Sequence, residues 1–500
     1  MTITQKLISA IISVVLAGLI TGCGYIFAQP AIKPHRLYLV LPGDHPDPSI
    51  VRDGNDFYLT HSSFKYTPAL PIWHSKDLLH WNLLTYALNH PPGEIWAPDF
   101  VKYNGKFYIY FPAAGTNWII TADSPLGPWS LPVDLKLAGI DPGHIAAPDG
   151  KRYLFVNGSR VVSLADDGLS VTSQPLKVYD GWPIPPDWTI ECFCDESPKL
   201  FYKDGFYYLT TAQGGTAGPA TSHMAVSARA PRPLGPFQNS PFNPIVHTFS
   251  SDERWWCKGH ATVFDDARGN WYIIYHAYEK NNLPLGRQVI IEPLEWTADG
   301  WFRLTRNPQL EPPTQVLPNA AVESDNFEQP RLKLQWQFTG LNALDDAQLV
   351  DGRLRLKAVP DRIRIMHAIT PDRNYQTAVK LEPLEGTEAG LIVYYNDSAF
   401  AGLAIDANSI FIVTDGKRPG PEITRRNVKY LRLTLKDYNL SFAYSSDGRR
   451  FIPYPDGLEI SAYHHNMLKG FSSIKIAIYT KGTAAVLIDD FKYHPLYNSP

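Results

Sequence analysis

The sequence predicts an all-β protein, a five-bladed β-propeller followed by a β-sandwich. Short apolar and aromatic runs alternate with Gly, Pro, Asn and Asp over residues 37–305, and no strong amphipathic helix interrupts them. In this region a turn glycine followed by an aromatic strand recurs five times. A proline-rich linker is expected at residues 306–320, and strands with period-two alternation follow over residues 321–497. With 500 residues, the chain is too long for one compact core.

The five repeats share a glycine that is followed three or four residues later by a tyrosine. These tyrosines are spaced 50, 45, 55 and 64 residues apart, at Tyr58, Tyr108, Tyr153, Tyr208 and Tyr272. A spacing of this size fits one four-stranded blade per repeat. We expect each tyrosine to be a core residue on the second strand of its blade, so five repeats predict five blades.

Ionisable residues precede the five tyrosines by 9 to 12 residues: Asp47, Asp99, Asp141, Glu196 and His260. This position corresponds to the start of the first strand of each blade, which lines the central channel of a propeller. Crowded carboxylates repel one another, so some pKa values rise while others stay low. An acid and a base can then coexist at one pH. Taken singly, each acid could cap a turn beside a proline, but five residues in register favour a functional site.

The strands expected in the C-terminal region alternate apolar and polar residues between regular turns, which is typical of a β-sandwich. They are expected at residues 354–357, 391–395, 430–435, 440–444 and 474–479. Acidic residues open and close the region, at Asp325 and at Asp489 and Asp490. These acids could hold a structural Ca²⁺ ion, and solvated turn acids are the alternative that we favour.

Residues 1–23 are expected to be a lipoprotein-type signal segment. Lys6 supplies a positive charge, and the apolar run over residues 7–19 is too short to span a bilayer, which takes about 20 helical residues. Residues 20–23, Ile-Thr-Gly-Cys, resemble a bacterial lipobox, which implies cleavage before Cys23 and its lipidation. We therefore expect an exported lipoprotein anchored at the outer membrane or the cell surface. A simple secretory signal and an uncleaved anchor are the alternatives.

Three further cysteines, Cys192, Cys194 and Cys257, would meet an oxidising compartment in an exported protein. Cys257 could pair with either of the other two and leave an odd thiol, or it could be a small buried apolar residue. The spacing of Cys192 and Cys194 is not that of a zinc site or a redox pair, so we assign it no chemistry.

The composition argues against a nucleic-acid partner and is compatible with a sugar ligand. Lys and Arg number 46 and Asp and Glu 49, which leaves a formal net charge of −3. A protein that binds phosphates by neutralising them needs an excess of cations. Trp, Tyr and Phe make up 13% of the chain. Most of these rings belong to the core, but a surplus suits the flat apolar faces of sugars.

Several short stretches resemble glycoside hydrolase family 43. They are His45-Pro-Asp47-Pro-Ser-Ile50, Ile95-Trp-Ala-Pro-Asp99, Gly139-Ile-Asp141-Pro, Glu196-Ser-Pro198 and Gly259-His260, with Leu285-Gly-Arg287 downstream. The resemblance covers roughly residues 40–305 and implies a five-bladed inverting enzyme of the β-xylosidase or α-L-arabinofuranosidase type. The C-terminal region resembles the concanavalin-like module of family xylosidases. In those relatives a loop of this module closes one side of the pocket, and the sequence does not identify the residue involved.

The resemblance implies three catalytic residues. Asp47 is the general base that activates a water molecule, and Glu196 is the general acid that protonates the departing oxygen. Asp141 tunes and orients the acid, because a nearby carboxylate raises the pKa of Glu196. Inverting enzymes hold their two carboxyls about 6.5–9.5 Å apart, which leaves room for the water. Ser197 replaces the Gly or Ala usual after the acid, and this small change leaves the assignment intact.

The resemblance also implies a substrate-binding set. Trp96 resembles a sugar-stacking wall and Phe64 an aromatic beside the same pocket, although both could be plain core rings. Arg287 resembles an arginine that contacts the sugar and the carboxylates, and a surface ion pair is the alternative. Asp99 and His260 complete the set, Asp99 as a structural partner near the axis. We expect no required cofactor, but His260 could ligate a Ca²⁺ ion through waters, since calcium takes six to eight oxygens.

The expected function is cleavage of terminal β-xylosyl or α-L-arabinofuranosyl residues from plant-type polysaccharides or oligosaccharides. Xylopyranose and arabinofuranose can present similar hydroxyl geometry, so the sequence does not separate the two specificities. The alternatives are an arabinanase or galactosidase of the same family and a non-catalytic glycan-binding propeller lipoprotein. A retaining propeller enzyme is disfavoured, because its nucleophile motif is absent from the sequence.

Overall fold

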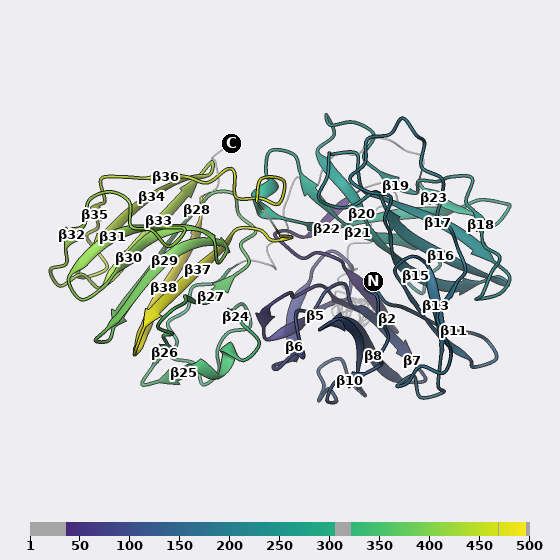
Figure 1. Cartoon of the computed structure of the whole chain (residues 1–500), viewed down its shortest axis with the longest axis horizontal. Coiled ribbons are helices and arrows are strands. Elements are labelled where there is room, and N and C mark those ends of the chain that lie inside the picture. Colours follow the sequence, from purple (N-terminus) through teal and green to yellow (C-terminus); the bar gives the residue numbers. More distant parts are fainter. Residues whose placement is uncertain (1–36, 306–321, 469, 497–500) are drawn as a thin grey trace, which may run out of the picture. The chain divides into compact units, whose positions relative to one another are not determined.

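The computed structural model describes residues 37–305, 322–468 and 470–496. Within these ranges the chain is almost entirely β-structure, with two short 3-10 turns, η1 (Leu283–Leu285) and η3 (Ala343–Asp346). The strands form five propeller sheets and two sandwich sheets (Figure 1), so the predicted fold class is confirmed. None of the helical segments in these ranges is long and apolar enough to cross a membrane. The expected signal segment (1–23) and linker (306–320) lie outside the described residues.

The first four blades are antiparallel sheets that follow one another along the chain. The first blade contains β2 (Ser49–Asp53), β3 (Asp56–Thr60), β5 (Ala69–Ser75) and β6 (Asn82–Leu88). The second contains β7 (Asp99–Tyr103), β8 (Lys106–Ala113), β9 (Thr116–Ala122) and β10 (Val133–Asp134). The third contains β11 (Gly143–Ala146), β12 (Arg152–Val156), β13 (Arg160–Leu164) and β14 (Leu176–Lys177). The fourth contains β15 (Asp195–Lys203), β16 (Phe206–Gln213), β17 (Met224–Ala230) and β18 (Gln238–Asn239), with β19 (Val246–His247) beside β17.

The fifth blade combines strands from both ends of the propeller region. Its strands are β20 (Trp255–Asp265), β21 (Trp271–Glu279), β22 (Gln288–Trp296) and β1 (Tyr38–Leu41), with β23 (Phe302–Leu304) also paired to β22. The N-terminal strand β1 runs antiparallel to β22, with Tyr38 opposite Ile291. This pairing closes the ring of blades and protects the edge of β22.

The repeat tyrosines occupy the predicted place in every blade. They lie on the second strands, Tyr58 on β3, Tyr108 on β8, Tyr153 on β12, Tyr208 on β16 and Tyr272 on β21. All but Tyr58 are buried. The first strands β2, β7, β11, β15 and β20 contact one another around the ring, so they line the axis. Each of the five ionisable residues therefore lies on or just before an axial strand, with His260 farther along its strand than the others.

The C-terminal domain is a sandwich of two antiparallel sheets, as the alternation predicts. One sheet has the order β32 (Ile423–Thr424), β31 (Ser409–Thr414), β30 (Ala399–Ile405), β29 (Thr387–Asn396), β37 (Lys475–Gly482), β27 (Arg364–Ala368), β24 (Gln337–Thr339) and β4 (Tyr66–Thr67). The other has the order β25 (Ala347–Val350), β26 (Arg353–Lys357), β38 (Ala485–Pro495), β28 (Tyr375–Pro383), β33 (Tyr430–Lys436), β34 (Asn439–Ser445) and β35 (Ile452–Pro453), with β36 (Leu458–Glu459) beside β34. Their inward-facing apolar residues form one continuous core.

Strand β4 comes from the propeller region but belongs to the sandwich sheet. It pairs antiparallel with β24, with Tyr66 opposite Thr339. The Tyr66 ring packs in a buried sandwich cluster with Ile365 and Ile392. The loop of the first blade is therefore held by backbone hydrogen bonds and apolar packing against the sandwich.

The acids at the two ends of the sandwich use their oxygens within the protein. Asp325 accepts hydrogen bonds from the backbone N–H of Phe327 and from the Trp336 indole N–H. Asp489 lies 2.8 Å from the Lys380 ammonium, and Asp490 lies 3.2 Å from the Lys492 ammonium. Because each acid has its own partner within the protein, the contacts favour the alternative of turn acids. A structural Ca²⁺ ion at the ends of the sandwich stays a prediction.

Of the two expectations for Cys257, a disulfide or a small buried residue, the structure agrees with the second. Cys192 and Cys194 form a disulfide, with their Cα atoms 5.3 Å apart, and Cys257 is free and buried. Pairing of Cys257 with either partner is therefore wrong, and the alternative of a small buried residue is correct. Burial raises the pKa of the Cys257 thiol to about 12, so the group stays protonated and inert.

A buried ion pair joins the first four blades near the axis. The Lys199 ammonium on β15 lies 2.8 Å from Asp99 Oδ1 on β7, and both side chains are almost fully buried. Asp99 also accepts hydrogen bonds from the Ser49 hydroxyl and from the backbone N–H of His144. Since these four residues belong to four blades, this one carboxylate aligns the inner strands on which the axial residues are placed.

We expect Lys199→Met to lower the free energy of unfolding by about 3–5 kcal/mol, because it leaves the Asp99 carboxylate buried without its cation. The double variant Lys199→Met with Asp99→Leu should recover part of this loss, since no uncompensated charge remains. Urea unfolding at pH 7 measures both effects. Lys151→Met is the control, because Lys151 pairs with Asp149 at the exposed surface. Equal shifts for Lys199→Met and Lys151→Met would contradict the role of the buried pair.

Candidate active site

One pocket at the propeller axis is lined by residues from every blade and from the sandwich. Its lining includes seven of the eight predicted site residues. The full set is Asp47, Phe64, Trp96, Ala97, Ile140, Asp141, Glu196, Thr216, His260, Arg287 and Phe471. The fivefold repeat therefore brings together side chains that are more than 200 residues apart in the sequence.

Three of the axial residues have left-handed backbone conformations that residues with a Cβ rarely adopt. The φ angles of Asp47, Asp141 and His260 are 60°, 56° and 57°. Such a conformation costs on the order of 1 kcal/mol or more for a residue other than glycine and concentrates at functional sites. Asp47 and Asp141 have this conformation just before the inner strand of their blade, and His260 has it within β20. All three side chains line the pocket.

Asp47 is held as a carboxylate by a buried arginine. Burial favours its neutral form, but the Arg287 guanidinium, together with His260 and His276, outweighs this effect and holds the pKa of Asp47 well below its ordinary value. Arg287 Nη1 lies 2.9 Å from Asp47 Oδ1, and both side chains are under a tenth exposed. The second carboxylate oxygen accepts a hydrogen bond of 2.5 Å from the Ser62 hydroxyl. The side chain is thus charged and fixed in orientation.

Two residues that the sequence did not single out position Asp47 from behind. The Ser62 oxygen accepts a hydrogen bond from the backbone N–H of Ala97, which directs its own proton to Asp47. The backbone N–H of Asp47 donates to His276 Nδ1 at 3.0 Å. His276 Nε2 therefore carries the proton of the neutral ring and donates to the Thr216 hydroxyl. Ser62 and His276 both lie four residues after the repeat tyrosine of their blade, but the other three blades carry no hydroxyl or ionisable side chain at this position, so the repeat did not mark them.

Glu196 and Asp141 are in the opposite electrostatic situation. Burial, and then the negative charge of Asp47, raises the pKa of Glu196 to about 7. Burial and the nearby Glu196 carboxyl raise the pKa of Asp141 well above its ordinary value. Asp141 accepts a hydrogen bond from the backbone N–H of Ser197, directly after Glu196. Two carboxyls so close together hold a proton between them at neutral pH.

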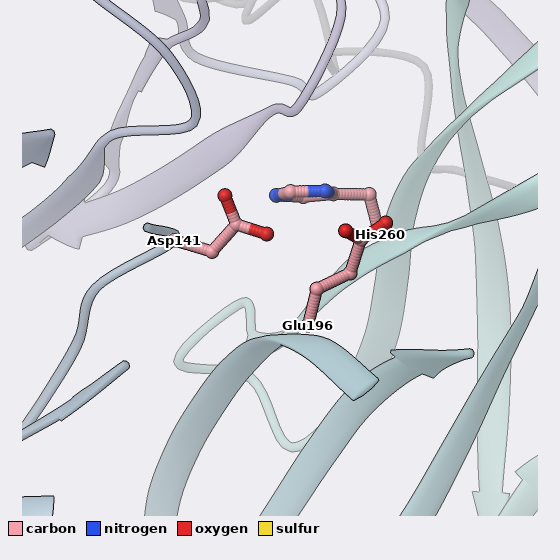
Figure 2. Close-up of side chains that lie close together, drawn as sticks. All are labelled: Asp141, Glu196 and His260. Atoms are coloured by element: carbon pink, nitrogen blue, oxygen red, sulfur yellow. The ribbon is translucent and has the colours of Figure 1, made fainter. Parts of the chain in front are cut away.

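Figure 2 shows Asp141, Glu196 and His260 pointing toward one another from three different parts of the ribbon. One ligand atom from each lies within 4.8 Å of the others. Ca²⁺ prefers six to eight oxygens, whereas this set offers one nitrogen and two carboxyls, one of which would lose its proton to a metal. The cluster therefore does not fit calcium directly. The predicted calcium bound through waters on His260 stays a prediction.

His260 is a neutral imidazole in this site. Burial lowers its pKa to about 3. Its Nδ1 lies 3.4 Å from Asp47 Oδ1, and its Nε2 is buried without a partner among the described residues. The unpaired Nε2 is available to a ligand in the pocket.

Aromatic rings form one side of the pocket. Trp96 is 38% exposed. Its ring lies 6.3 Å from Phe64 and 6.4 Å from Phe471, edge-to-face in both pairs. The Arg287 guanidinium lies 5.7 Å from both phenylalanine rings, and its Nη2 has no hydrogen-bond partner within the described part of the chain. Phe471 comes from the sandwich, in the segment before β37, and sequence reasoning missed it because it is an isolated aromatic outside the repeats.

Asp99 does not line the pocket and is a correction to the predicted substrate-binding set. Both of its carboxylate oxygens are used within the protein, by Lys199, Ser49 and the backbone of His144. The residue begins β7 at the predicted position, but its side chain joins the blades. This agrees with the expectation of a structural partner near the axis.

Comparisons with known proteins agree with this architecture. Residues 39–302 match the family described as "Glycosyl hydrolases family 43", and residues 324–494 match "Beta xylosidase C-terminal Concanavalin A-like domain". The chain is 31% identical to the non-reducing end alpha-L-arabinofuranosidase BoGH43B of Bacteroides ovatus, over 80% of this chain and 78% of that protein. It is 26% identical to the beta-xylosidase of Bacillus subtilis, over 83% and 84% of the two chains.

The solved structures include close matches in fold. The crystal structure of xylan beta-1,4-xylosidase from Bacillus halodurans superposes with a TM-score of 0.80 at 25% identity, covering 92% of this chain and all of that one. Together with the matched family region and the axial carboxyls, this shows that the chain belongs to glycosyl hydrolases family 43, a family of inverting glycoside hydrolases.

Proposed function

We propose that this protein removes terminal β-xylosyl or α-L-arabinofuranosyl residues from plant-type polysaccharides or oligosaccharides with inversion at the anomeric carbon. The observation that carries this proposal is a pair of carboxyls in one pocket with opposite protonation states. Asp47 is kept ionised by Arg287, and the pKa of Glu196 is raised to about 7. Relatives named arabinofuranosidase and beta-xylosidase support the substrate class.

Asp47 serves as the general base. Its ionised carboxylate takes a proton from a water molecule as the water oxygen attacks the anomeric carbon of the sugar in the pocket. The hydrogen bond from Ser62 and the ion pair with Arg287 hold the carboxylate in one orientation. A fixed base needs no reorganisation at the moment of reaction.

Glu196 serves as the general acid on the opposite side of the scissile bond. It gives its proton to the glycosidic oxygen, which leaves with the remainder of the glycan. Burial and the charge of Asp47 disfavour the charged form of Glu196 before the transfer, and the contact of Asp141 with the backbone of Ser197 fixes the loop of the acid. The acid is reset when a proton returns from solvent.

The remaining pocket groups suit a single terminal sugar. The partly exposed Trp96 ring offers a stacking face. Arg287 Nη2 and His260 Nε2 are buried polar atoms with no partner among the described residues, so sugar hydroxyls can pair with both. Phe471 stands on the rim beside Trp96. A pocket with an aromatic rim favours action at chain ends.

Two alternatives are separable by experiment. Arabinanase or galactosidase specificity would show in a panel of aryl glycosides and oligosaccharides with analysis of the released sugars. A non-catalytic glycan-binding protein would bind members of the panel and release none. Proton NMR of the anomer formed first decides between inversion and retention.

Carboxyl removal tests the two catalytic assignments. We expect Asp47→Ala and Glu196→Ala each to lower kcat on natural glycosides about 10²–10⁴-fold, the usual contribution of a general base or acid. Glu196→Ala should recover much of its rate on aryl glycosides with a good leaving group, because such a group departs without a proton, whereas Asp47→Ala should not. The control is Glu295→Gln, on β22 and paired with Arg303 outside the pocket. Full activity of Glu196→Ala on natural glycosides would refute the acid.

The pKa directions predict the pH profile. Glu196 must be protonated to act, and its pKa is about 7, so kcat/KM on a natural disaccharide should fall above pH 7. Asp47 must be ionised, and its pKa lies well below its ordinary value, so activity should persist down to about pH 4. A steady-state profile between pH 4 and 9 measures both limbs. A kcat/KM that increases from pH 7 to 8 would contradict the assignment.

Arg287→Met tests what keeps Asp47 charged. Without the guanidinium, burial raises the pKa of Asp47, so the acid limb of kcat/KM should move upward into the measurable range and the rate should drop at all pH values. Arg254→Met is the matched control, because Arg254 pairs with Glu279 at the surface. An acid limb that stays in place for Arg287→Met would show that another group sets the charge of Asp47.

We also propose export and lipid anchoring, which rest on residues 1–23 alone. Lys6, the short apolar run and the residues before Cys23 are the features that support it. Expression in a bacterial host with labelled fatty acid should place label on the wild-type chain and none on Cys23→Ser. Label on both chains, or on neither, would overturn the anchor.

A further inference from the structure

Large exposed aromatic side chains are few and unevenly placed. Among the described residues, Trp and Phe rings that are more than about a third exposed occur at Trp96, Phe193, Phe249 and Phe471. Trp96 and Phe471 line the pocket. Phe193 and Phe249 do not, yet they are 85% and 67% exposed. Clustered apolar surface left in water usually marks a binding surface.

Phe249 belongs to a stacked group of rings. Trp188 lies on His247 with ring centres 4.4 Å apart and an interplanar angle of 8°. Trp182 and Phe249 contact Trp188 edge-on, at 5.8 and 6.3 Å. His247 Nε2 is hydrogen-bonded to the Thr221 carbonyl at 2.8 Å. These ring contacts and the hydrogen bond of His247 hold the group of rings in one arrangement. We call these four rings, together with Phe193, which follows Trp188 by five residues in the sequence, the aromatic ledge.

Phe193 lies on the short segment that leads to Glu196, the proposed general acid. Phe193 lies between the disulfide-bonded Cys192 and Cys194, three residues before Glu196. The short disulfide loop limits the freedom of Phe193. The preceding Glu191 accepts a hydrogen bond of 2.7 Å from the backbone N–H of Ala217, the neighbour of the pocket residue Thr216. The loop is thus connected to the pocket in two ways, by the sequence that leads to Glu196 and by the hydrogen bond between Ala217 and Glu191.

We propose that the aromatic ledge binds the leaving-group side of the substrate, the glycan chain from which the terminal sugar is removed. The inference rests on the proposed function, because Glu196 protonates the oxygen that joins the terminal sugar to this chain. The departing sugars must then lie beside Glu196 and outside the pocket, where its loop carries Phe193. Pentose rings have apolar C–H faces that stack on aromatic rings, and the neutral ledge suits an uncharged glycan.

The ledge predicts a preference for long substrates. A disaccharide fills the pocket and the place beside Glu196, whereas a longer chain also reaches the rings beyond. Each ring gained should raise kcat/KM roughly three- to tenfold, the size of one aromatic contact. The substrate class inferred here is a terminal sugar on an extended chain.

The test compares wild type with Phe193→Ala, Phe249→Ala and the double variant. The readout is the ratio of kcat/KM for arabinoxylan or xylohexaose to kcat/KM for xylobiose. We expect this ratio to fall roughly three- to tenfold for each ring removed. Phe193→Trp should preserve the ratio, whereas Phe193→Leu should not. Leu131→Ala is the control, since Leu131 is 87% exposed between β9 and β10.

A second measurement does not need catalysis. The full chain with Glu196→Gln should be retarded by arabinoxylan in affinity electrophoresis, and the retardation should be lost when Phe193→Ala and Phe249→Ala are added. An unchanged ratio together with unchanged retardation would overturn the ledge, as would a change of oligomeric state caused by these substitutions. Failure of the proposed function would look different, as a wild type that hydrolyses no glycoside while its retardation still depends on the two rings.

Discussion

The buried ion pair between Asp47 and Arg287 is the interaction on which the chemistry of this site depends. Burial by itself raises the pKa of this carboxyl and favours the neutral form, which could not act as a base. Arg287 is itself fixed by a hydrogen bond of 3.0 Å from its backbone N–H to Asp44. Asp44 in turn faces the buried Lys475 ammonium of the sandwich at 3.6 Å. Residues of alternating charge, Lys475, Asp44 and Arg287, thus connect the sandwich to Asp47.

The raised pKa of Glu196, the proposed acid, comes from burial and from the negative charge of Asp47, which together outweigh the opposing effect of Arg287. Burial and the nearby Glu196 carboxyl raise the pKa of Asp141 in the same way. The pocket therefore divides three carboxyls into an ionised Asp47 and a pair with raised pKa values. This separation in pKa comes from the surroundings of each carboxyl, since the side chains have nearly the same intrinsic acidity.

The sandwich contributes to the candidate active site. It provides Phe471 to the pocket rim and Lys475 to the charge network. One of its sheets also includes β4, which begins two residues after the pocket residue Phe64 in the first blade. A catalytic propeller without its sandwich would lose one pocket wall and the ordered loop that carries another.

The sequence by itself predicted the five blades, five of the sandwich strands and seven of the pocket residues, four of them from the repeat and three from the family resemblance. The repeat in the chain is a repeat in space, so Asp47, Asp141, Glu196 and His260 could be placed on one axis before any coordinates were known. Asp99 shared that register and yet turned out to join blades, because register specifies a strand position and not the partner of a side chain. The tertiary structure alone decided the roles of Ser62, His276 and Phe471. Their contacts with the site come from a loop of the first blade, from strand β21 and from the sandwich, and a repeat position does not specify which partner a side chain will contact.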